Sequence, residues 1–513
     1  MRTISAFLAL ALAATGCSRR GAEGPAQPLM VFCAAGLKKP VEAVAAQYRA
    51  ETGTEVQLQF GGSATLLSQL RIAQQGDLFI AADDGTIADA RQAGAIHEVI
   101  PLAKQHPVIA VSAGNPKGVR ALADLSRDGV GLALANPEAA SIGKATKAVL
   151  GERYAALAAH AKVTKPTVTE IAADVKLGAV DAAIIWDSTA RTFGLEFVEV
   201  PELSPRVENA SAAVLSSTRN AALALRFARY LAAPEKGGAI FQANGFTPAG
   251  GDKWALTPEM ILYSGGVNRP AVEKLLRDFS EREGATVTTV FNGCGVLCAT
   301  MKTMGDATNP KFPDAYYACD ICFVPPVAKY FPEATVLTET DIGIVVKKGN
   351  PLDVRTLADL ARPGLRVGLC NSVQSTLGYM TVGMLRNAGL LDSVKKNVSV
   401  EVPTADFLIN QMRAGGLDAA VVYRVNARLQ REHLDYLPLE VAGAKAVQPF
   451  SVRTASPNGQ LAGRLLEYFK AHRASFEEAG FQWRGDEAAV QSAKIEVPAW
   501  LRDAGTGPNA TTK

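Results

Sequence analysis

The sequence predicts an α/β fold made by tandem duplication of one domain, and three observations carry this prediction. The chain has 513 residues, which is enough for two domains of ordinary size. Several blocks recur in one order, with offsets from 230 residues (31 to 261) to 237 residues (83 to 320). Within each copy, short apolar runs alternate with amphipathic helical patterns, which is typical of parallel βαβ structure.

The N-terminal segment has the features of a processing signal. Arg2 supplies a positive charge, and residues 4–14 form an apolar run too short to cross a bilayer. Residues 14–17, Ala-Thr-Gly-Cys, resemble the bacterial lipobox, whose cysteine is lipidated and becomes the new N-terminus. We therefore expect a lipoprotein signal peptide in residues 1–17, with a lipid anchor on Cys17. The alternative is an ordinary signal peptide with a chance cysteine.

The segment that follows this signal, residues 18–27, is expected to be a short flexible tether. No later segment reaches about 18 uninterrupted apolar residues, the length needed for a membrane span. The mature protein is thus expected in the periplasm or cell envelope, anchored to a membrane by lipid only.

The first repeated block pairs residues 31–40 with residues 261–270. Each contains a short apolar strand, a turn of small residues, and a proline at a helix start, where its fixed φ is tolerated. Apolar residues then recur at i, i+3, i+4 and i+7, which predicts one buried face in each helix. These residues are Val41, Val44, Ala45 and Tyr48 in copy one, and Val272, Leu275, Leu276 and Phe279 in copy two.

Five further blocks recur in the same order. They pair residues 60–63 with 291–294, 77–83 with 314–320, 114–125 with 349–360, 136–143 with 371–378, and 178–186 with 415–423. A stretch rich in Pro and Gly over 247–258 marks the seam between the copies. We therefore expect a first domain in 28–255, a second in 256–502, and a flexible tail in 503–513.

Three turns of the first copy are candidate anion sites. In a parallel sheet, ligands collect at the carboxyl ends of the strands, where helix N-termini present unpaired N–H groups. The turns are residues 35–38, 61–65 and 140–143; all three contain Gly, and the second and third also contain Ser. The alternative is that they are ordinary strand-to-helix turns whose small polar residues act as caps.

The order of these blocks resembles the periplasmic molybdate-binding proteins of ABC importers. The resemblance rests on residues 60–63 (Phe-Gly-Gly-Ser), 77–83 (Asp-Leu-Phe-Ile-Ala-Ala-Asp), 114–116 (Gly-Asn-Pro) and 180–186 (Val-Asp-Ala-Ala-Ile-Ile-Trp). It implies a two-lobed, periplasmic-binding-protein-like domain, each lobe a mainly parallel sheet flanked by helices. It also implies that the lobes close on a tetrahedral oxyanion held by neutral hydrogen bonds, and that a membrane ABC permease is the partner.

The resemblance also implies which residues contact the ligand. In copy one they are Gly36, Lys38, Gly62, Ser63, Ala82, Ser141, Ile142 and Trp186. In copy two they are Gly266, Asn268, Gly293, Cys294, Cys319, Thr376 and Tyr423. Copy one departs from the family pattern twice, because Gly36 replaces a serine and Trp186 replaces a tyrosine. An indole N–H can donate but not accept, so these changes leave the identity of the anion open.

The second copy concentrates the cysteines. Its five thiols belong to Cys294, Cys298, Cys319, Cys322 and Cys370, near strand ends expected to face the cleft. Three interpretations stay open: disulfides, a soft metal site of converging thiolates, or free thiols in the cleft wall with Cys294 and Cys319 as small polar residues. Spacing alone cannot choose among them.

Other functional classes lack support in the sequence. The chain has five histidines, and no hydrolase or nucleotide-binding motif is found, so we expect no enzyme and no required cofactor. Asp83 and Asp320 are expected to be helix caps. Lys and Arg are dispersed, which argues against nucleic acid as a partner. The leading hypothesis is an oxyanion receptor, and the alternative is a thiol-based metal or redox module in domain two with domain one as scaffold or sensor.

Overall fold

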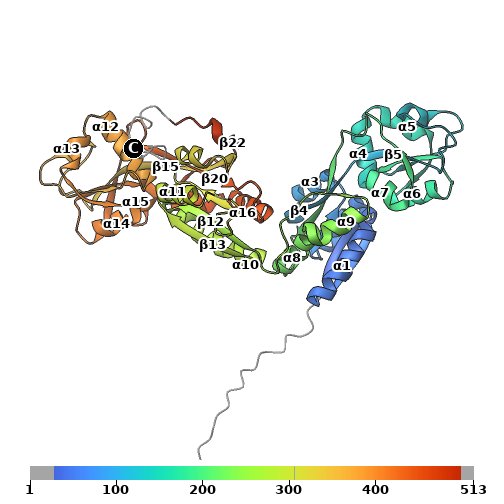
Figure 1. The fold of residues 1–513 in the computed structure, drawn as a ribbon, viewed down its shortest axis with the longest axis horizontal. Coiled ribbons are helices and arrows are strands. Elements are labelled where there is room, and N and C mark those ends of the chain that lie inside the picture. The colour runs from blue at the N-terminus through green and yellow to red at the C-terminus, as the bar shows by residue number, and fades with distance from the viewer. Residues whose placement is uncertain (1–27, 306, 498–513) are drawn as a thin grey trace, which may run out of the picture.

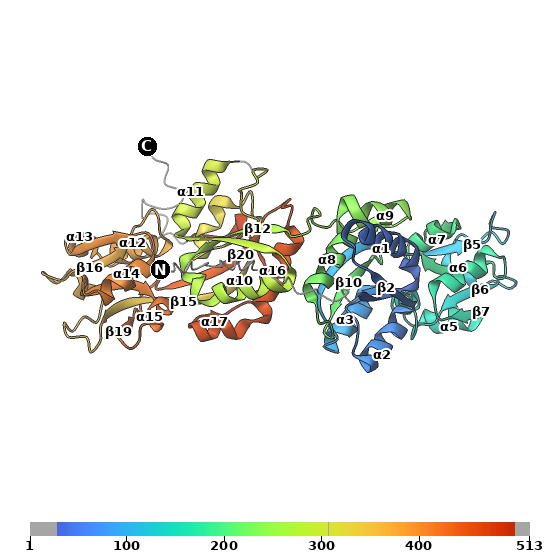
Figure 2. The same cartoon turned by 90° about the horizontal axis from the view of Figure 1, so that it is seen from below.

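The protein, seen here as a computed structural model, consists of two α/β domains joined in tandem (Figure 1). The structure describes residues 28–305 and 307–497. Each domain has two lobes, and the first lobes of the two domains meet at the centre of the molecule through α8 (Ala221–Ala232) and α10 (Arg269–Glu283) (Figures 1 and 2). The second lobes lie at the two far ends.

The first lobe of domain one is a mixed six-stranded sheet in the order β11-β4-β10-β3-β1-β2. Strand β1 pairs in parallel with β2 and β3, whereas β10, β4 and β11 are antiparallel. The strands are β1 (Leu29–Ala34), β2 (Val56–Gly61), β3 (Leu78–Ala81), β4 (Ile96–Gln105), β10 (Glu208–Leu215) and β11 (Thr247–Pro248). The helices are α1 (Lys38–Thr52), α2 (Ser63–Ala73), α3 (Asp84–Gln92), α8 and α9 (Ala239–Ala243).

The second lobe of domain one repeats this plan with five strands in the order β7-β6-β8-β5-β9. Its strands are β5 (Pro107–Val111), β6 (Leu132–Ala135), β7 (Ala161–Lys165), β8 (Ala182–Trp186) and β9 (Glu196–Val198). Its helices are α4 (Ser141–Leu150), α5 (Arg153–His160), α6 (Val168–Lys176) and α7 (Asp187–Phe193). The chain passes between the lobes at His106 and returns before β10.

Domain two joins its two lobes through one long strand, β15 (Glu333–Lys347), which belongs to a continuous 11-stranded sheet. The first lobe contains β12 (Glu259–Gly265), β13 (Thr286–Asn292), β14 (Ala315–Tyr317), β20 (Lys445–Val452), β21 (Gln482–Trp483) and β22 (Val490–Gln491) with α10, α11 (Cys294–Met304), α16 (Gly459–Ala471) and α17 (Arg473–Ala479). The second contains β16 (Val367–Cys370), β17 (Val398–Val402), β18 (Ala419–Tyr423) and β19 (Leu434–Pro438) with α12 (Thr376–Asn387), α13 (Leu391–Lys395), α14 (Ala405–Arg413) and α15 (Arg424–Arg428).

The predicted helix faces are confirmed. All eight apolar positions singled out in α1 and α10 are buried. Both helices end at a glycine with positive φ, Gly53 at 73° and Gly284 at 59°, a backbone conformation that favours glycine at a helix end. The same helix signals therefore shape both copies.

The predicted two-lobed α/β class is confirmed, but the sheets are mixed rather than mainly parallel, with parallel strands on one side of each lobe and antiparallel strands on the other. The antiparallel strands include β4, β10 and β15, where the chain passes between the lobes, and repeated βαβ units alone did not indicate these. The predicted boundary at 255/256 lies between the last strand of domain one, which ends at Pro248, and β12. The signal segment, Cys17, the tether and the tail lie outside the described residues. No helix in the described part of the chain is long and apolar enough to cross a membrane.

Candidate functional site

Domain one has a small cavity where its two lobes meet. Its empty volume is about 230 Å³. The lining residues come from five turns of both lobes and are Ala34, Ala35, Gly36, Gly61, Gly62, Ser63, Ala82, Ala140, Ser141, Thr167 and Val168. Every one of these side chains is uncharged, so a ligand here meets small apolar groups, hydroxyls and backbone.

Three helices begin at this cavity. Helix α2 starts at Ser63, α4 at Ser141 and α6 at Val168. The N–H groups of a first helical turn have no partner within the helix, and the positive end of the helix dipole lies there. Backbone N–H groups and hydroxyls around a neutral cavity can hold an anion without a charged side chain.

The lobes of domain one are closed on each other. The N–H groups of Ala64 and Thr65, in the first turn of α2, donate to the carbonyl oxygen of Ala139 in the opposite lobe, at 3.2 and 3.5 Å. The contact is so close that a Cβ atom on Gly62 would lie 2.3 Å from that oxygen. Lys144 and Asp89 form an ion pair across the same gap. A glycine at position 62 is therefore needed for the lobes to meet.

Most of the predicted contact residues of copy one gather at this cavity. Gly36, Gly62, Ser63, Ala82 and Ser141 all line it. Ser63 is almost fully buried, and its Oγ accepts a hydrogen bond from the Ala82 N–H at 3.3 Å.

The other three predicted residues of copy one lie elsewhere. Ile142 is buried and does not line the cavity. The Lys38 side chain is 58% exposed, lies near Glu42, and has its ammonium over the Phe60 ring, so the structure does not bring it to the cavity. Trp186 is buried at the end of β8, and its Nε1 has no hydrogen-bond partner among the described residues.

Position 36 explains one departure from the family pattern. A Cβ atom on Gly36 would lie 3.0 Å from a Val168 methyl carbon and 3.6 Å from the Thr189 hydroxyl. Val168 thus takes up room that a serine at position 36 would need.

Sequence reasoning missed the turn that precedes α6. Thr167 caps this helix by accepting from the Glu170 N–H at 3.3 Å, and its hydroxyl donates to the Glu170 carboxylate at 2.6 Å. The Thr-x-x-Glu pattern is a recognisable helix start. The Pro-Thr pair at 166–167 also recurs at 403–404, so the repeat itself contained the signal.

Domain two closes in the same way. The Val296 N–H, in the first turn of α11, donates to the Gln374 carbonyl oxygen of the opposite lobe at 3.3 Å. A Cβ atom on Gly293 would lie 2.3 Å from that oxygen. Gly266 is buried, and a Cβ atom there would lie 3.5 Å from Thr404 of the second lobe.

A pair of thiols occupies the position of Ser63 and Ala82 in this second cleft. Cys294 begins α11, and Cys319 follows β14. Their Sγ atoms share a hydrogen bond at 3.0 Å, and the Cys319 N–H donates to the Cys294 sulfur at 3.0 Å. The second bond repeats the one from the Ala82 N–H to Ser63 Oγ.

The two thiols differ in acidity. Burial raises the pKa of Cys294, but hydrogen bonds from Cys319 and Tyr316 outweigh it, and the pKa lies below its usual value. The hydrogen bond to Cys294 and burial raise the pKa of Cys319 well above its usual value.

The remaining cysteines do not join this pair. The six described cysteines are free and buried, so none of the envisaged disulfides is formed. Cys298 contacts the Tyr316 hydroxyl and the Phe323 carbonyl, and burial raises the pKa values of Cys298 and Cys370 to about 12. Burial also raises the pKa of Cys322. Within residues 28–305 and 307–497, no group of three or more His, Cys, Asp or Glu side chains is placed to hold a metal ion, so four or five thiolates do not converge.

The remaining residues of copy two that were predicted to contact the ligand have two different roles. Asn268 is fully buried, and its amide donates to the carbonyls of Tyr317 and Ala318 at 3.1 and 3.3 Å, which fixes the first turn to β14. Thr376 and Tyr423 come from the second lobe, at the start of α12 and the end of β18. Both are buried on the side of the cleft opposite the thiols.

The repeated aspartates are helix caps, as predicted. The Asp83 carboxylate accepts from the Thr86 N–H at 2.8 Å, and the Asp320 carboxylate accepts from the Cys322 N–H at 2.9 Å.

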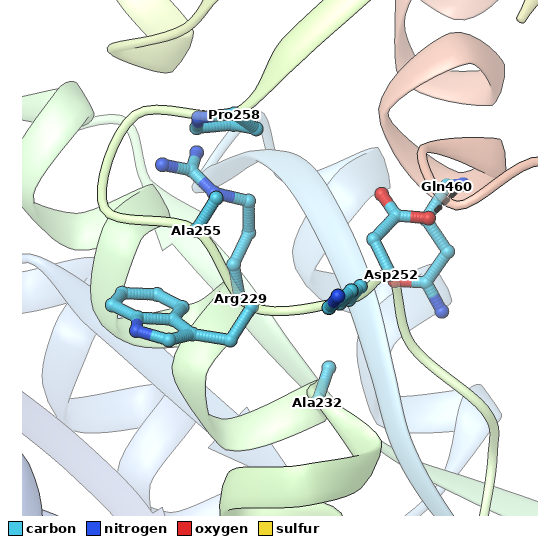
Figure 3. A pocket seen from close by; sticks show the side chains of 8 residues that line it. Arg229, Ala232, Asp252, Ala255, Pro258 and Gln460 are labelled. Carbon is cyan, nitrogen blue, oxygen red and sulfur yellow. Dashed lines mark hydrogen bonds between the residues drawn. The ribbon is translucent and has the colours of Figure 1, made fainter. Parts of the chain in front are cut away.

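A second small cavity lies at the seam between the domains, where Arg229, Asp252 and Gln460 surround the connecting segment (Figure 3). Asp252 caps α16 by accepting from the N–H groups of Gln460 and Leu461, each at 2.8 Å. Arg229 donates to the Glu283 carbonyl at 2.7 Å. Both contacts link an element of domain two to the end of domain one or to the connecting segment, so this cavity lies at a structural joint.

The fold and the two clefts define a protein that closes paired lobes on a small ligand, with the binding unit present twice in one chain. The chain belongs to the bacterial extracellular solute-binding protein family, whose model matches residues 29–247 and again residues 261–482. The predicted resemblance is thereby confirmed for both copies.

Individual relatives cover one copy each. The molybdate-binding protein ModA of Mycobacterium tuberculosis is 30% identical over 253 residues, which are 47% of this chain and 95% of that protein. The protein of the same name from Mycobacterium bovis matches to the same extent. Among solved structures, the periplasmic molybdate-binding protein of Azotobacter vinelandii covers 43% of this chain and 98% of its own, at 20% identity and a TM-score of 0.38.

Proposed function

We propose that domain one captures a tetrahedral oxyanion of the molybdate type, and that the chain is the receptor of an ABC importer. The observation that carries this proposal is the neutral cavity at which α2, α4 and α6 begin. Two relatives named as molybdate-binding proteins support it. The function is binding and delivery, without catalysis.

The binding step follows from the geometry. An anion enters between the open lobes and first meets the Ser63 hydroxyl at the start of α2. Closure then brings Ser141 and the first turn of α4 to its other side. Because the donors are fixed by helix ends, they keep their orientation and need little reorganisation when the anion binds.

The test is calorimetry of the full chain against molybdate, tungstate, sulfate and phosphate. Ser63→Ala removes a hydroxyl donor to a charged ligand, which costs about 1.5–3 kcal/mol, or roughly 10- to 100-fold in Kd. Ser68→Ala is the matched control, because Ser68 lies on the exposed face of the same helix and bonds only to the Ala64 carbonyl. If the chain binds none of the four anions, the proposal fails.

We further propose that Cys17 carries a lipid that holds both domains at a membrane beside the permease. The lipobox-like residues 14–17 support this, and they are followed by a short linking segment. Cys17→Ala should leave the protein in the soluble envelope fraction, whereas the unchanged chain should stay with membranes. An unchanged membrane fraction for the variant would contradict a lipid on Cys17.

A further inference from the structure

The two clefts differ at one hydrogen-bonded pair of positions. In domain one, a backbone N–H of Ala82 donates to the side chain of Ser63, and in domain two the N–H of Cys319 donates to the side chain of Cys294. Both positions are cysteine in domain two, on an equivalent backbone arrangement. The result is a dithiol where domain one has one hydroxyl and one methyl group.

The dithiol is part of the cleft, on the first lobe. Cys294 is 0% exposed and Cys319 is 4% exposed in the closed domain. A Cβ atom on Gly265 would lie 2.3 Å from the Cys319 sulfur, so the glycine leaves room for this thiol.

Two hydroxyls face this dithiol from the opposite lobe. The Thr376 hydroxyl is close enough to both thiols to affect their pKa values. The pKa of Tyr423 is raised by burial and by Cys319 and Cys294. Thr376 is 0% exposed and Tyr423 is 3% exposed, yet neither hydroxyl makes a hydrogen bond of regular geometry with any residue that the structure describes. Buried hydroxyls without partners are costly, which points to a ligand that supplies oxygen atoms.

The sulfur spacing narrows the class of ligand. Consider one central atom bonded to both sulfurs at about 2.3 Å, which is the usual zinc–thiolate length. If the S–centre–S angle is close to 90°, as on a pyramidal centre, the two sulfurs lie about 3.3 Å apart. If the centre is linear, they lie about 4.6 Å apart. A disulfide needs about 2.05 Å. The observed separation of 3.0 Å is closest to the pyramidal case. Thiolates also prefer soft centres to hard ones.

We propose that the cleft of domain two captures a trivalent, thiophilic oxyacid, of which arsenous acid is the simplest, as an adduct of Cys294 and Cys319. Two arsenic–sulfur bonds form and two arsenic–oxygen bonds break. The two thiol protons leave with the two hydroxide groups as two waters, and no atom changes its oxidation state. The third hydroxyl stays on arsenic and faces Thr376 and Tyr423.

This inference rests on the proposed function in one respect, namely that the clefts capture solutes between closing lobes. Opening exposes the dithiol, and closure adds the hydroxyls of the second lobe. Domain one then binds its anion by hydrogen bonds alone, whereas domain two forms covalent bonds to sulfur.

The test is native mass spectrometry of the full chain with arsenite, after reduction and a count of free thiols. We expect one arsenic per chain, with the mass of two waters lost. Cys294→Ser and Cys319→Ala place the residues of domain one at these positions, so they suit the same backbone. Each should weaken arsenite binding at least 100-fold, because a second bond on one ligand adds about 10²–10⁴ in effective affinity.

Cys298→Ser is the matched control, because Cys298 is a buried thiol in the same helix outside the pair, and it should bind arsenite like the unchanged chain. Molybdate binding is measured on the same samples, so failure of the oxyanion proposal is seen separately. The inference is overturned if the fully reduced chain takes no arsenite, or if the double variant Cys294→Ser/Cys319→Ala still takes one.

Discussion

Two glycines set how far the lobes can close. Gly62 and Gly293 each lie against two carbonyl oxygens of the opposite lobe. In both cases, a Cβ atom added to the glycine would lie 2.3 Å from one oxygen and 2.8 Å from the other. These neighbours are backbone atoms, which cannot move aside as a flexible side chain can. A single methyl group at either position therefore raises the free energy of the closed state, whereas the open state has no such clash.

Gly62→Ala should weaken molybdate binding about 5- to 150-fold, because overpacking costs about 1–3 kcal/mol in the closed state. Isothermal calorimetry measures the effect. Gly463→Ala, where an added Cβ meets no atom within 4 Å, should bind molybdate like the unchanged chain. Equal affinity of the Gly62→Ala and Gly463→Ala variants would show that closure against Ala139 plays no part in binding.

Sequence reasoning found the cleft residues that sit directly at strand-to-helix turns. Ser63, Ser141 and Cys294 begin helices, so their place in the chain already puts them at the cleft. Lys38 also begins a helix, but its side chain points along the exposed surface of α1 toward Glu42. The pairing of Cys294 with Cys319 required the fold, because 25 residues separate them.

The connection between the lobes differs between the two domains. In domain one, β4 and β5 are separate strands broken at His106, and the Asp187 carboxylate accepts from the His106 N–H at 3.0 Å. Pro107 follows the break and has no N–H to offer a sheet. In domain two the corresponding passage is the unbroken β15. The proline explains this difference between the two domains.

In the second lobe of domain two, Asp418, which directly precedes β18, binds Arg366. Its carboxylate accepts from the N–H of Arg366 at 3.0 Å and from the guanidinium at 2.7 Å. The hydrogen bond from the Arg366 side chain lowers the pKa of Asp418 to about 2. In domain one, Asp181 accepts from the Gly131 N–H at 2.7 Å. This bond was not foreseen, although the repeated blocks contained both aspartates.

Asp418→Asn should lower the free energy of unfolding at pH 7 by about 1 kcal/mol, after allowing for solvent screening. Since the folded pKa lies below the unfolded value, this contribution is present above about pH 4 and is lost as the pH falls through about 2. Urea unfolding at pH 7 and pH 2.5 measures it. Asp128→Asn, at an exposed position, makes the same change of charge and should leave stability unchanged. Equal losses at both pH values would contradict a role for the ionised carboxylate.

The two domains are joined by a buried group of three charges. Glu283, at the end of α10, is 1% exposed and accepts from Arg464 at 2.6 and 3.0 Å and from Arg229 at 3.2 Å. Arg282 beside it pairs with Glu98 of domain one. The two partners of Glu283 lie 54 and 181 residues away. A repeat found by sequence comparison gives no information on this joint, since Arg229 belongs to one copy whereas Glu283 and Arg464 belong to the other.

Glu283→Ala should destabilise the chain by about 3–5 kcal/mol, because it leaves two buried guanidinium groups without their counter-ion. Calorimetric unfolding should change from one joint transition to two separate ones. Glu281→Ala, at an exposed position of the same helix, should keep the single transition. A single unaltered transition in the Glu283→Ala variant would contradict a rigid joint.

The central claim is that one fold, used twice, holds two clefts of different chemistry. Native mass spectrometry of the reduced full chain with molybdate and arsenite together tests it most directly. We predict a complex with one molybdate and one arsenic per chain, in which neither ligand displaces the other. Two molybdates per chain, or displacement of molybdate by arsenite, would contradict the claim.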